Sequence, residues 1–353
     1  MNDNEFRLLR KVKMPLSVLI LAAGKGTRMN SNYPKVLHNV GNIPMIYYSI
    51  DLAQKLNATN IGVVISEKAV EIRNFIKRFS KKIDLIVQSK QLGTGHAILS
   101  AKKFEKKVGD VIILYGDCPL ISIDSLNNLI TARKKGADLA VLGFFADNPK
   151  QYGRLAVDEN NNLKKIIEFK DATKDELGIK LCNSGVMIAN NRILFSLLNQ
   201  IRNNNSAQEF YLTDIVHNAN KEGLNVQYVN CSELEAQGVN NRKDLSEVEN
   251  QFQVNKRIEA LSNGVTLKDP SSTYFSYDTE IGKDTIIEPN VTFGTGVKIK
   301  NDVVVKSFSY LEGCEVNPNV TLGPFARIRP KTILDEGVKV GNFVEIKQSH
   351  LSQ

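Results

Sequence analysis

The chain has 353 residues, 42% of them hydrophobic, which is enough for two domains with ordinary cores and excludes a disordered protein. Its 46 Lys and Arg against 38 Asp and Glu give a net charge of +8, but the basic residues are scattered and no reader motif is present, so we expect no nucleic-acid partner. Four cysteines far apart and four histidines without zinc spacing are typical of free thiols in a reducing cytoplasm.

The first predicted strand is the apolar run SVLILAA at residues 17–23. A basic flank precedes it, as in a signal peptide, but the apolar run is only about ten residues long, which is too short to cross a bilayer. The run continues directly into a glycine-rich loop, which favours a buried strand and predicts no integral membrane segment. We assign no function to the stretch MNDNEFRLLRKV at residues 1–12.

The loop after this strand, LAAGKGTRMNSNYPK at residues 21–35, contains both glycines and positively charged side chains. Gly24 and Gly26 allow backbone N–H groups to approach an anion, while Arg28 and Lys35 supply cationic side chains. Met29 stands where a dinucleotide-binding G-x-G-x-x-G has its third glycine, and no G-K-[ST] follows at the spacing of a P-loop. The pattern indicates a phosphate-binding loop of another kind, with a solvated turn as the alternative.

Short apolar runs then alternate with helical segments up to residue 230, which is typical of a parallel sheet covered by helices. The predicted helices include residues 45–56, 96–107 and 123–135, each with apolar residues on one face. We expect a doubly wound, Rossmann-like α/β domain whose ligand site lies at the carboxyl ends of the strands. The further predicted strands are residues 60–66, 82–88, 110–117, 137–145 and 180–190.

A different pattern begins after residues 242–261, which contain no Pro or Gly and predict one continuous helix ended by SNG. Beyond it an apolar residue recurs at every sixth position, with one gap of eleven residues after Leu311. Such a period predicts a three-sided β-helix whose coils stack by parallel pairing. The predicted domains are residues 1–241 and 265–353, connected by a helix over 242–264. The recurring residues are Ile281, Ile287, Phe293, Ile299, Val305 and Leu311, then Leu322, Ile328, Leu334, Val340 and Ile346.

Ten short motifs follow one another along the chain from about Leu16 onward. They are LAAGKGTRM, PKVLH, QLGTGHA, LYGDCPLI, YGR, EFKDAT, CNSG, YLTDI, GVNNR and GPFARIRP. The first resembles the signature of sugar-1-phosphate nucleotidyltransferases. The whole order is similar to that in a family of bifunctional bacterial enzymes, the N-acetylglucosamine-1-phosphate uridylyltransferases and glucosamine-1-phosphate acetyltransferases.

The resemblance implies a Rossmann-like nucleotidyltransferase domain with a parallel-core sheet, followed by an incomplete left-handed parallel β-helix of hexapeptide repeats. The implied reaction transfers UMP from UTP to N-acetylglucosamine-1-phosphate and releases pyrophosphate. The product, UDP-N-acetylglucosamine, is a precursor of the cell wall and of lipopolysaccharide, so the implied location is the cytoplasm. The sugar phosphate attacks the α-phosphorus in line and needs no base, because the nucleophile is already an anion.

The resemblance also implies roles for single residues. Arg28, Lys35 and Asp117 match catalytic positions, and Asp117 and Asn240 match the two protein ligands of Mg²⁺. On the sequence alone, the alternative for Asp117 is a helix N-cap or a turn aspartate, and the alternative for Lys35 is a surface lysine.

The substrate contacts implied by the resemblance fall into two groups. A glutamine such as Gln88 can present a paired donor and acceptor to a uracil edge. Each sugar contact has an alternative: Gly153 could be a turn glycine, Glu168 a solvent-facing strand end and Asn183 a β-bulge asparagine. The nucleotide positions are Leu21, Ala22, Ala23, Gly24, Lys35, Gln88, Gly93, Thr94, Tyr115, Gly116, Asp117 and Asn240, and the sugar positions are Gly153, Glu168 and Asn183.

At the C-terminus this chain departs from the family pattern, because family members normally continue well beyond the position of Gln353. Arg329 and Lys347 match residues that hold the sugar phosphate at the acetyltransferase site, whereas the catalytic histidine and the acetyl-CoA contacts would lie beyond Gln353. His350 is not at the matching position. We therefore expect no acetyltransferase activity from this chain alone, and a homotrimer formed through the β-helix that the short repeat region weakens.

Two other functions remain open on the sequence. One is a related nucleotidyltransferase that uses another sugar phosphate or another NTP, against which QLGTGHA, CNSG and GVNNR stand. The other is a non-catalytic trimeric scaffold or sugar-nucleotide sensor, whose decay should have removed at least one of Arg28, Lys35, Asp117 and Asn240.

Overall fold

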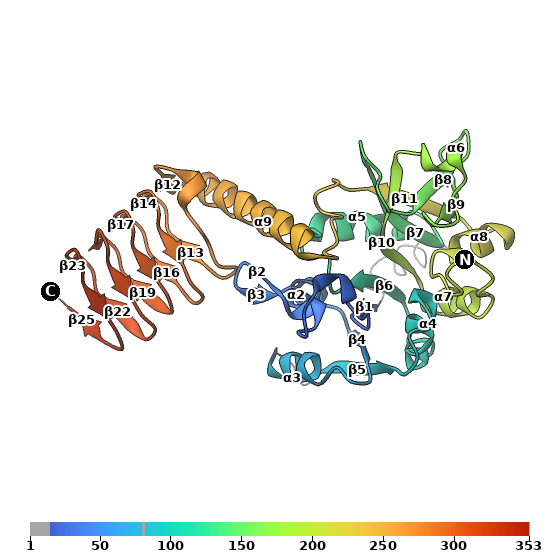
Figure 1. Ribbon diagram of the computed structural model, residues 1–353, viewed down its shortest axis with the longest axis horizontal. Coiled ribbons are helices and arrows are strands. Elements are labelled where there is room, and N and C mark those ends of the chain that lie inside the picture. Colours follow the sequence, from blue (N-terminus) through green and yellow to red (C-terminus); the bar gives the residue numbers. More distant parts are fainter. Residues whose placement is uncertain (1–14, 80–81, 353) are drawn as a thin grey trace, which may run out of the picture. The chain divides into compact units, whose positions relative to one another are not determined.

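The computed structural model describes residues 15–79 and 82–352, so the stretch at residues 1–12 lies outside the described residues. The described chain forms two compact units (Figure 1). The first unit takes the described residues up to His38 and those from Met45 to Asp244, and the second takes Asn39–Pro44 and the residues from Leu245 onward. No helix of the described residues is long and apolar enough to cross a membrane.

The first unit is built on a nine-stranded sheet with the strand order β11-β7-β10-β6-β1-β4-β5, to which β8 and β9 are attached through β10. Strands β6, β1, β4 and β5 are parallel, as predicted, whereas β10 runs antiparallel to β6 and β7. The sheet is therefore mixed around a parallel core. The strands are β1 Leu16–Leu21, β4 Asn60–Ser66, β5 Ile83–Gln88, β6 Asp110–Tyr115, β7 Leu139–Phe145, β8 Arg154–Val157, β9 Leu163–Ile167, β10 Leu181–Asn190 and β11 Val226–Asn230.

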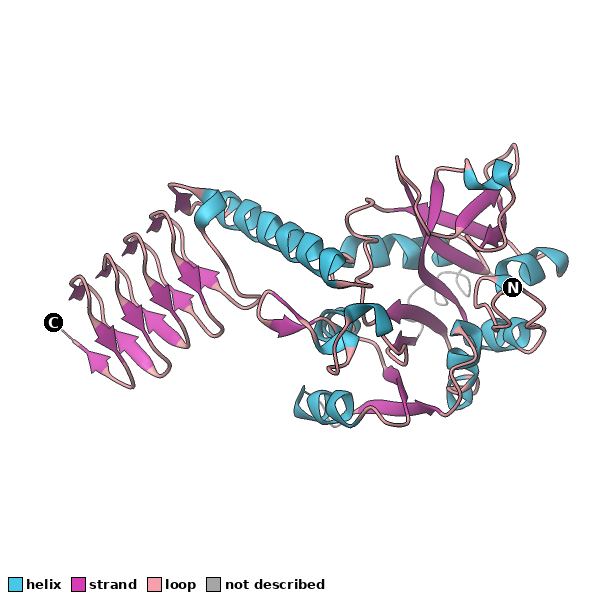
Figure 2. Cartoon of the chain, viewed as in Figure 1, coloured by secondary structure: helices cyan, strands magenta, loops and turns pink. Residues whose placement is uncertain are grey.

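Both faces of this sheet are covered, which explains why its strands are continuous apolar runs. In β1, Leu19 and Leu21 join the core on one face while Val18 and Ile20 join the core on the other. Helices pack over both cores (Figure 2). They are α2 Ile46–Lys55, α3 Val70–Phe79, α4 Thr94–Leu99, α5 Ile123–Lys134, α7 Asn191–Leu198 and α8 Asp214–Lys221. The short helix α6, Lys174–Leu177, buries no residue.

The helix predicted over residues 96–107 is shorter than expected. Helix α4 ends at Leu99, and a 3-10 turn, η3 Lys102–Phe104, replaces its second half. The Ser100 hydroxyl donates to the carbonyl of His96 at 3.0 Å, a local bond that competes with regular helix geometry. The turn buries Phe104 completely, so the core contact is made without the helix.

The second unit contains a hairpin of β2 Asn39–Val40 and β3 Ile43–Pro44, helix α9 Arg242–Ser262 from Leu245 onward, and three parallel sheets of short strands. The hairpin belongs here because the Gly41 N–H donates to Glu249 at 2.8 Å and the Gly41 carbonyl accepts from the Tyr277 N–H at 2.9 Å. The domain boundaries predicted from the sequence stay a prediction. Residues 39–44 group with the second unit through these contacts, which span more than 200 positions of the sequence.

The three parallel sheets form the predicted β-helix. The sheet orders are β12-β14-β17-β20-β23, β13-β16-β19-β22-β25 and β15-β18-β21-β24, so each strand pairs with one a full coil away. Strand bounds are β12 Thr266–Leu267, β13 Glu280–Ile281, β14 Ile286–Ile287, β15 Thr292–Phe293, β16 Lys298–Ile299, β17 Val304–Val305, β18 Tyr310–Leu311, β19 Cys314–Val316, β20 Thr321–Leu322, β21 Arg327–Ile328, β22 Thr332–Leu334, β23 Lys339–Val340, β24 Glu345–Ile346 and β25 His350–Leu351.

The recurring residues of the sequence pattern line the core of the β-helix, with Ile281 partly buried at one end. Val316 fills the gap of eleven residues, because it pairs with Ile299 below and Leu334 above. It follows Leu311 after five residues instead of six. The same five-residue step occurs from Ile346 to Leu351, which pairs with Leu334.

Candidate active site

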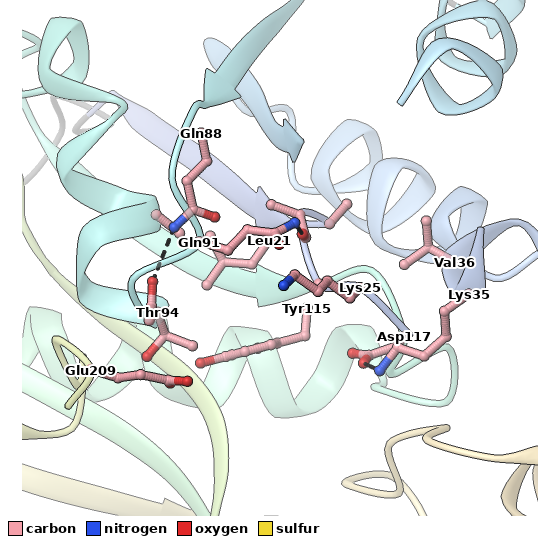
Figure 3. A pocket seen from close by; sticks show the side chains of 15 residues that line it. Leu21, Lys25, Lys35, Val36, Gln88, Gln91, Thr94, Tyr115, Asp117 and Glu209 are labelled. Carbon is pink, nitrogen blue, oxygen red and sulfur yellow. Dashed lines mark hydrogen bonds and ion pairs between the residues drawn. The ribbon is translucent and has the colours of Figure 1, made fainter. Parts of the chain in front are cut away.

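A cavity of about 410 Å³ opens at the carboxyl ends of β1, β5 and β6. This is where ligands bind in doubly wound sheets. It brings together most of the predicted nucleotide positions: Leu21, Ala22, Ala23, Gly24, Lys35, Gln88, Gly93, Thr94, Tyr115 and Asp117. Figure 3 shows Leu21, Lys35, Gln88, Thr94, Tyr115 and Asp117 around it. Lys25, Gln91 and Glu209 also line it, and the sequence reasoning did not select them although Gln91 lies in the motif QLGTGHA.

The glycine-rich loop is anchored by buried residues on either side of its exposed part. The 3-10 turn η1, Thr27–Met29, buries Met29 completely, and a second turn, η2 Lys35–Leu37, buries Val36 and Leu37. Gly26 has a φ of +63°, and a Cβ there would lie 2.7 Å from Cβ of Lys35. A glycine is therefore required for the loop to pass this close to Lys35.

Four charged and polar side chains meet beside the cavity. The Lys35 ammonium forms an ion pair with Asp117 and lies 3.4 Å from Oδ1 of Asn240. Arg28 donates to the same Asn240 oxygen at 3.0 Å. The loop that carries Asn240 is held by its backbone N–H, which donates to Asp244 at 2.8 Å. Arg28, Lys35, Asp117 and Asn240 are hereafter called the charged cluster.

The charged cluster has the donor set of a magnesium site. The Lys35 ammonium contacts both the Asp117 carboxylate and the Asn240 amide oxygen. The two oxygens therefore face one common position, where they attract a cation. Two oxygen ligands from the protein suit Mg²⁺, which usually keeps water and phosphate as its other ligands. In the described part of the chain no group of three His, Cys, Asp or Glu side chains could hold a metal.

The other end of the cavity is lined by Gln88, Gln91, Gly93 and Thr94. Gln91 donates to the carbonyl of Ala23 at 2.6 Å, and the Thr94 hydroxyl accepts from the Leu212 N–H at 3.1 Å. Gly93 has a φ of +105°, and a Cβ there would lie 2.7 Å from the Phe210 carbonyl oxygen. At this end of the cavity, closely packed backbone thus holds the two glutamine side chains in place.

The predicted sugar residues lie outside this cavity. Gly153 and Asn183 are joined by a backbone hydrogen bond of 2.8 Å from the Asn183 N–H, and Asn183 stands at a register shift of β10, as its β-bulge alternative predicted. Glu168 accepts from the Thr213 hydroxyl at 2.9 Å and lines a second cavity of about 980 Å³. Thr213 lies in the motif YLTDI but was not selected from the sequence.

Electrostatic contacts connect the two cavities through Tyr115. Its ring packs against Gly185, where a Cβ would lie 2.6 Å from the ring, and Gly185 has a φ of +86°. Burial and the nearby charge of Glu168 raise the pKa of Tyr115, and burial also raises the pKa of Glu168. Asp214, close to Glu168, has its pKa raised to about 6 by burial and by the charges of Glu168 and Asp171. Gly116 donates its N–H to the Leu21 carbonyl at 2.9 Å, which holds the ends of β1 and β6 together.

Arg329 and Lys347, the predicted acetyltransferase contacts, follow the paired strands β21 and β24 of the second unit. Arg329 donates to Glu345 at 2.7 Å and Lys347 is exposed. His350 pairs with Asp335 at 2.9 Å. Its side chain thus has a structural partner, consistent with leaving it out of the site.

Comparisons with known proteins agree with these two units. A family model described as "MobA-like NTP transferase domain" matches residues 18–172, and one described as "Bacterial transferase hexapeptide (six repeats)" matches residues 278–313. The "Bifunctional protein GlmU" of Bartonella quintana is 42% identical over 336 residues, covering 95% of this chain and 75% of that protein. The protein of the same name from Ruegeria sp. is 45% identical over 340 residues, covering 96% and 75%.

Among solved structures, a putative glucose-1-phosphate thymidylyltransferase from Bacillus anthracis, in complex with a sucrose, is similar with a TM-score of 0.56. The two chains are 20% identical, and the similarity covers 67% of this chain and 95% of that one. At this identity the likeness supports the fold alone. The chain spans about three quarters of the length of its GlmU relatives.

Proposed function

The chain belongs to the GlmU family of bifunctional proteins, and from that premise we propose that its first unit transfers UMP from UTP to N-acetylglucosamine-1-phosphate. The products are UDP-N-acetylglucosamine and pyrophosphate, for the synthesis of cell-wall and lipopolysaccharide precursors. The observation that carries the proposal is the charged cluster beside a cavity walled by the glycine-rich loop.

The charged cluster can serve nucleotidyl transfer by position and charge alone. Lys35 and Arg28 place two cations next to the glycine-rich loop, where the triphosphate of UTP would lie. These cations offset charge that develops on the phosphorus as the sugar phosphate attacks and pyrophosphate leaves. Backbone groups of Leu21 to Gly24 and the side chain of Gln88 would hold the uridine. No protein nucleophile is required, because the attacking phosphate is already an anion.

Asp117 and Asn240 would hold Mg²⁺, which when bound supplies positive charge to the phosphate oxygens. The Lys35 ammonium contacts both of these oxygens, so it lies beside the position that a metal would take. Glu168, Asn183 and Gly153 would bind the sugar, since hydrogen-bonding groups of this kind suit hydroxyls and an N-acetyl amide.

The test is a pyrophosphate-release assay on the purified chain with UTP, Mg²⁺ and N-acetylglucosamine-1-phosphate. A panel with ATP, glucose-1-phosphate and dTTP runs beside it. We expect the first combination to give the highest kcat/KM. Turnover of ATP or glucose-1-phosphate above that of the proposed pair would contradict the substrate assignment. Absence of turnover with every pair would favour the non-catalytic scaffold.

Three further expectations remain proposals. The second unit is proposed to form a homotrimer, and the cytoplasm is the proposed location, since the substrates of the reaction are made there. For these 353 residues assayed alone we propose no acetyltransferase activity, which thiol release from acetyl-CoA with glucosamine-1-phosphate would test. Sedimentation of the full chain would test the trimer.

A further inference from the structure

Gln88 closes the carboxyl end of β5 and is almost completely buried, with 4% of its surface exposed, yet it reaches the cavity. A buried amide must find partners for two N–H protons and one oxygen. The group that faces the cavity decides whether the pocket offers a ligand a donor or an acceptor.

A backbone carbonyl determines the orientation of this amide. One terminal atom of Gln88 lies 3.2 Å from the Gly93 carbonyl oxygen, which can only accept, so that atom is the NH₂ nitrogen. The Gly93 carbonyl cannot easily move, because it also accepts from the Ala97 N–H at the start of α4. The opposite orientation would bring two carbonyl oxygens together.

His96 takes the second proton of the same nitrogen. Its Nδ1 lies 3.1 Å from the Gln88 nitrogen, and since that nitrogen is a donor, Nδ1 must accept and the imidazole proton lies on Nε2. Both protons of the Gln88 amide therefore have partners inside the protein.

The amide oxygen is the part of Gln88 that remains for a ligand. Within residues 15–79 and 82–352 no group donates to it, and it is not one of the fully buried polar atoms that lack a partner. It is thus open toward the cavity. In Figure 3 the Gln88 nitrogen turns toward the segment of Thr94 and the oxygen points away from that bond.

We propose that His96 is a positioning residue for base selection, which holds the Gln88 amide so that only its oxygen faces the base. The proposal rests on the proposed function, in which this cavity receives the nucleotide. A pocket with an acceptor at this point prefers a base that carries an N–H on its pairing edge. Uracil has the N3–H proton there, whereas cytosine has a lone pair at N3, which would face the lone pairs of the amide oxygen.

Loss of the His96 acceptor would weaken this selection in a defined way. One proton of the Gln88 amide would lose its partner. The reversed amide would still place its oxygen against the Gly93 carbonyl, but it would no longer give up the bond to His96, so reversal would cost one hydrogen bond less. A reversed amide can donate to N3 of cytosine. The binding of UTP should therefore weaken while the binding of CTP weakens less or improves.

The experiment measures equilibrium binding of UTP and CTP to the full chain by titration calorimetry in Mg²⁺. The variants are His96→Leu, which removes the acceptor, and His96→Asn, whose side-chain carbonyl can replace it. His350→Leu is the matched control, since it removes a histidine of the second unit that pairs with Asp335. We expect the ratio of the CTP and UTP Kd values to fall about five- to tenfold in His96→Leu, the effect of one hydrogen bond. It should stay near wild type in His96→Asn and His350→Leu.

An equal loss of affinity for both nucleotides in His96→Leu would overturn the proposal, because it would reveal a packing role only. The ratio of the CTP and UTP Kd values could fall in His96→Leu although the wild-type chain releases no pyrophosphate. That result would support the positioning role and overturn the proposed function. If the wild type binds neither nucleotide, both are overturned. Circular dichroism checks the fold of each variant, and His96→Ala provides the same comparison if His96→Leu does not fold.

Discussion

Gly26→Ala tests how the glycine-rich loop positions Lys35. The added methyl group would lie 2.7 Å from Cβ of Lys35, and ordinary contact begins near 3.4 Å, so the loop or Lys35 must move by at least 0.7 Å. The β-carbon of Lys35 cannot rotate away, and the side chains of the next two residues, Val36 and Leu37, are buried. The displacement therefore reaches the ammonium that contacts Asp117.

Two effects contribute to the expected loss of stability. Alanine at a φ of +63° costs about 1–2 kcal/mol, and the overlap with Lys35 adds roughly 1–2 kcal/mol more. We expect the free energy of unfolding in urea to fall by about 2–4 kcal/mol. The kcat/KM for pyrophosphate release should fall at least about tenfold, because displacements approaching 1 Å around reacting groups can cost up to 100-fold.

Gly223→Ala is the matched control. Gly223 has a φ of +72° but nothing within 4 Å of an added Cβ, so this variant carries the conformational cost without the overlap. It should lose about 1–2 kcal/mol and keep its kcat/KM. Equal stability losses in the two variants, together with an unchanged kcat/KM in Gly26→Ala, would refute the idea that Gly26 is needed for the position of Lys35.

Other predictions concern the charged cluster and the buried carboxyl groups. Asp117→Ala should lower kcat by about 100-fold or more with an unchanged circular dichroism spectrum, and unchanged turnover in Mg²⁺ would remove the metal assignment. Excess EDTA should stop pyrophosphate release and added Mg²⁺ should restore it; activity that persists in EDTA would contradict a metal at Asp117 and Asn240. Thr213→Val removes a hydrogen bond that lowers the pKa of Glu168, so the acidic limb of the kcat/KM profile should move to higher pH, which an unshifted profile would disprove. The pKa of Asp214 is raised from 3.8 to about 6, so the folded state keeps a proton that the unfolded chain releases, and wild-type stability should fall as pH rises through this window. Asp214→Asn should remove that fall and gain roughly 1 kcal/mol at pH 7, a discounted value because the carboxyl group is only half-buried; a pH-independent difference in unfolding free energy would contradict this.

The β-helix could be predicted well from the sequence because its core takes one side chain from each short strand. Leu322 and Ile328 occupy the places that the six-residue period assigns to them. The same holds for β1, whose apolar run reflects burial on both faces. Periodicity does not encode strand direction, however, so the antiparallel pairing of β10 could not be predicted from its residues.

Only those site residues whose type and motif indicate a chemical role could be predicted from the sequence. Lys35 and Asp117 were selected as separate motifs 82 positions apart, and folding brings them into an ion pair. His96 was not selected, because its contact with Gln88 depends on the turn of backbone between them and on the position of the Gly93 carbonyl. Residues 39–44 lie in the second unit for a similar reason, since their partners Glu249 and Tyr277 are distant in the chain.

The two five-residue steps of the β-helix, to Val316 and to Leu351, have a consequence for how such repeats evolve. Both occur at the same corner, between the sheet that holds Leu311 and Ile346 and the sheet that holds Val316 and Leu351. A corner can therefore lose one residue while the flanking strands keep the same side chains inward. The hexapeptide match ends at residue 313, within the first short step from Leu311 to Val316, although the stacked strands continue to Leu351. Deletions of single residues at this corner can thus accumulate without loss of the fold while they hide the repeat from any search that demands a constant spacing.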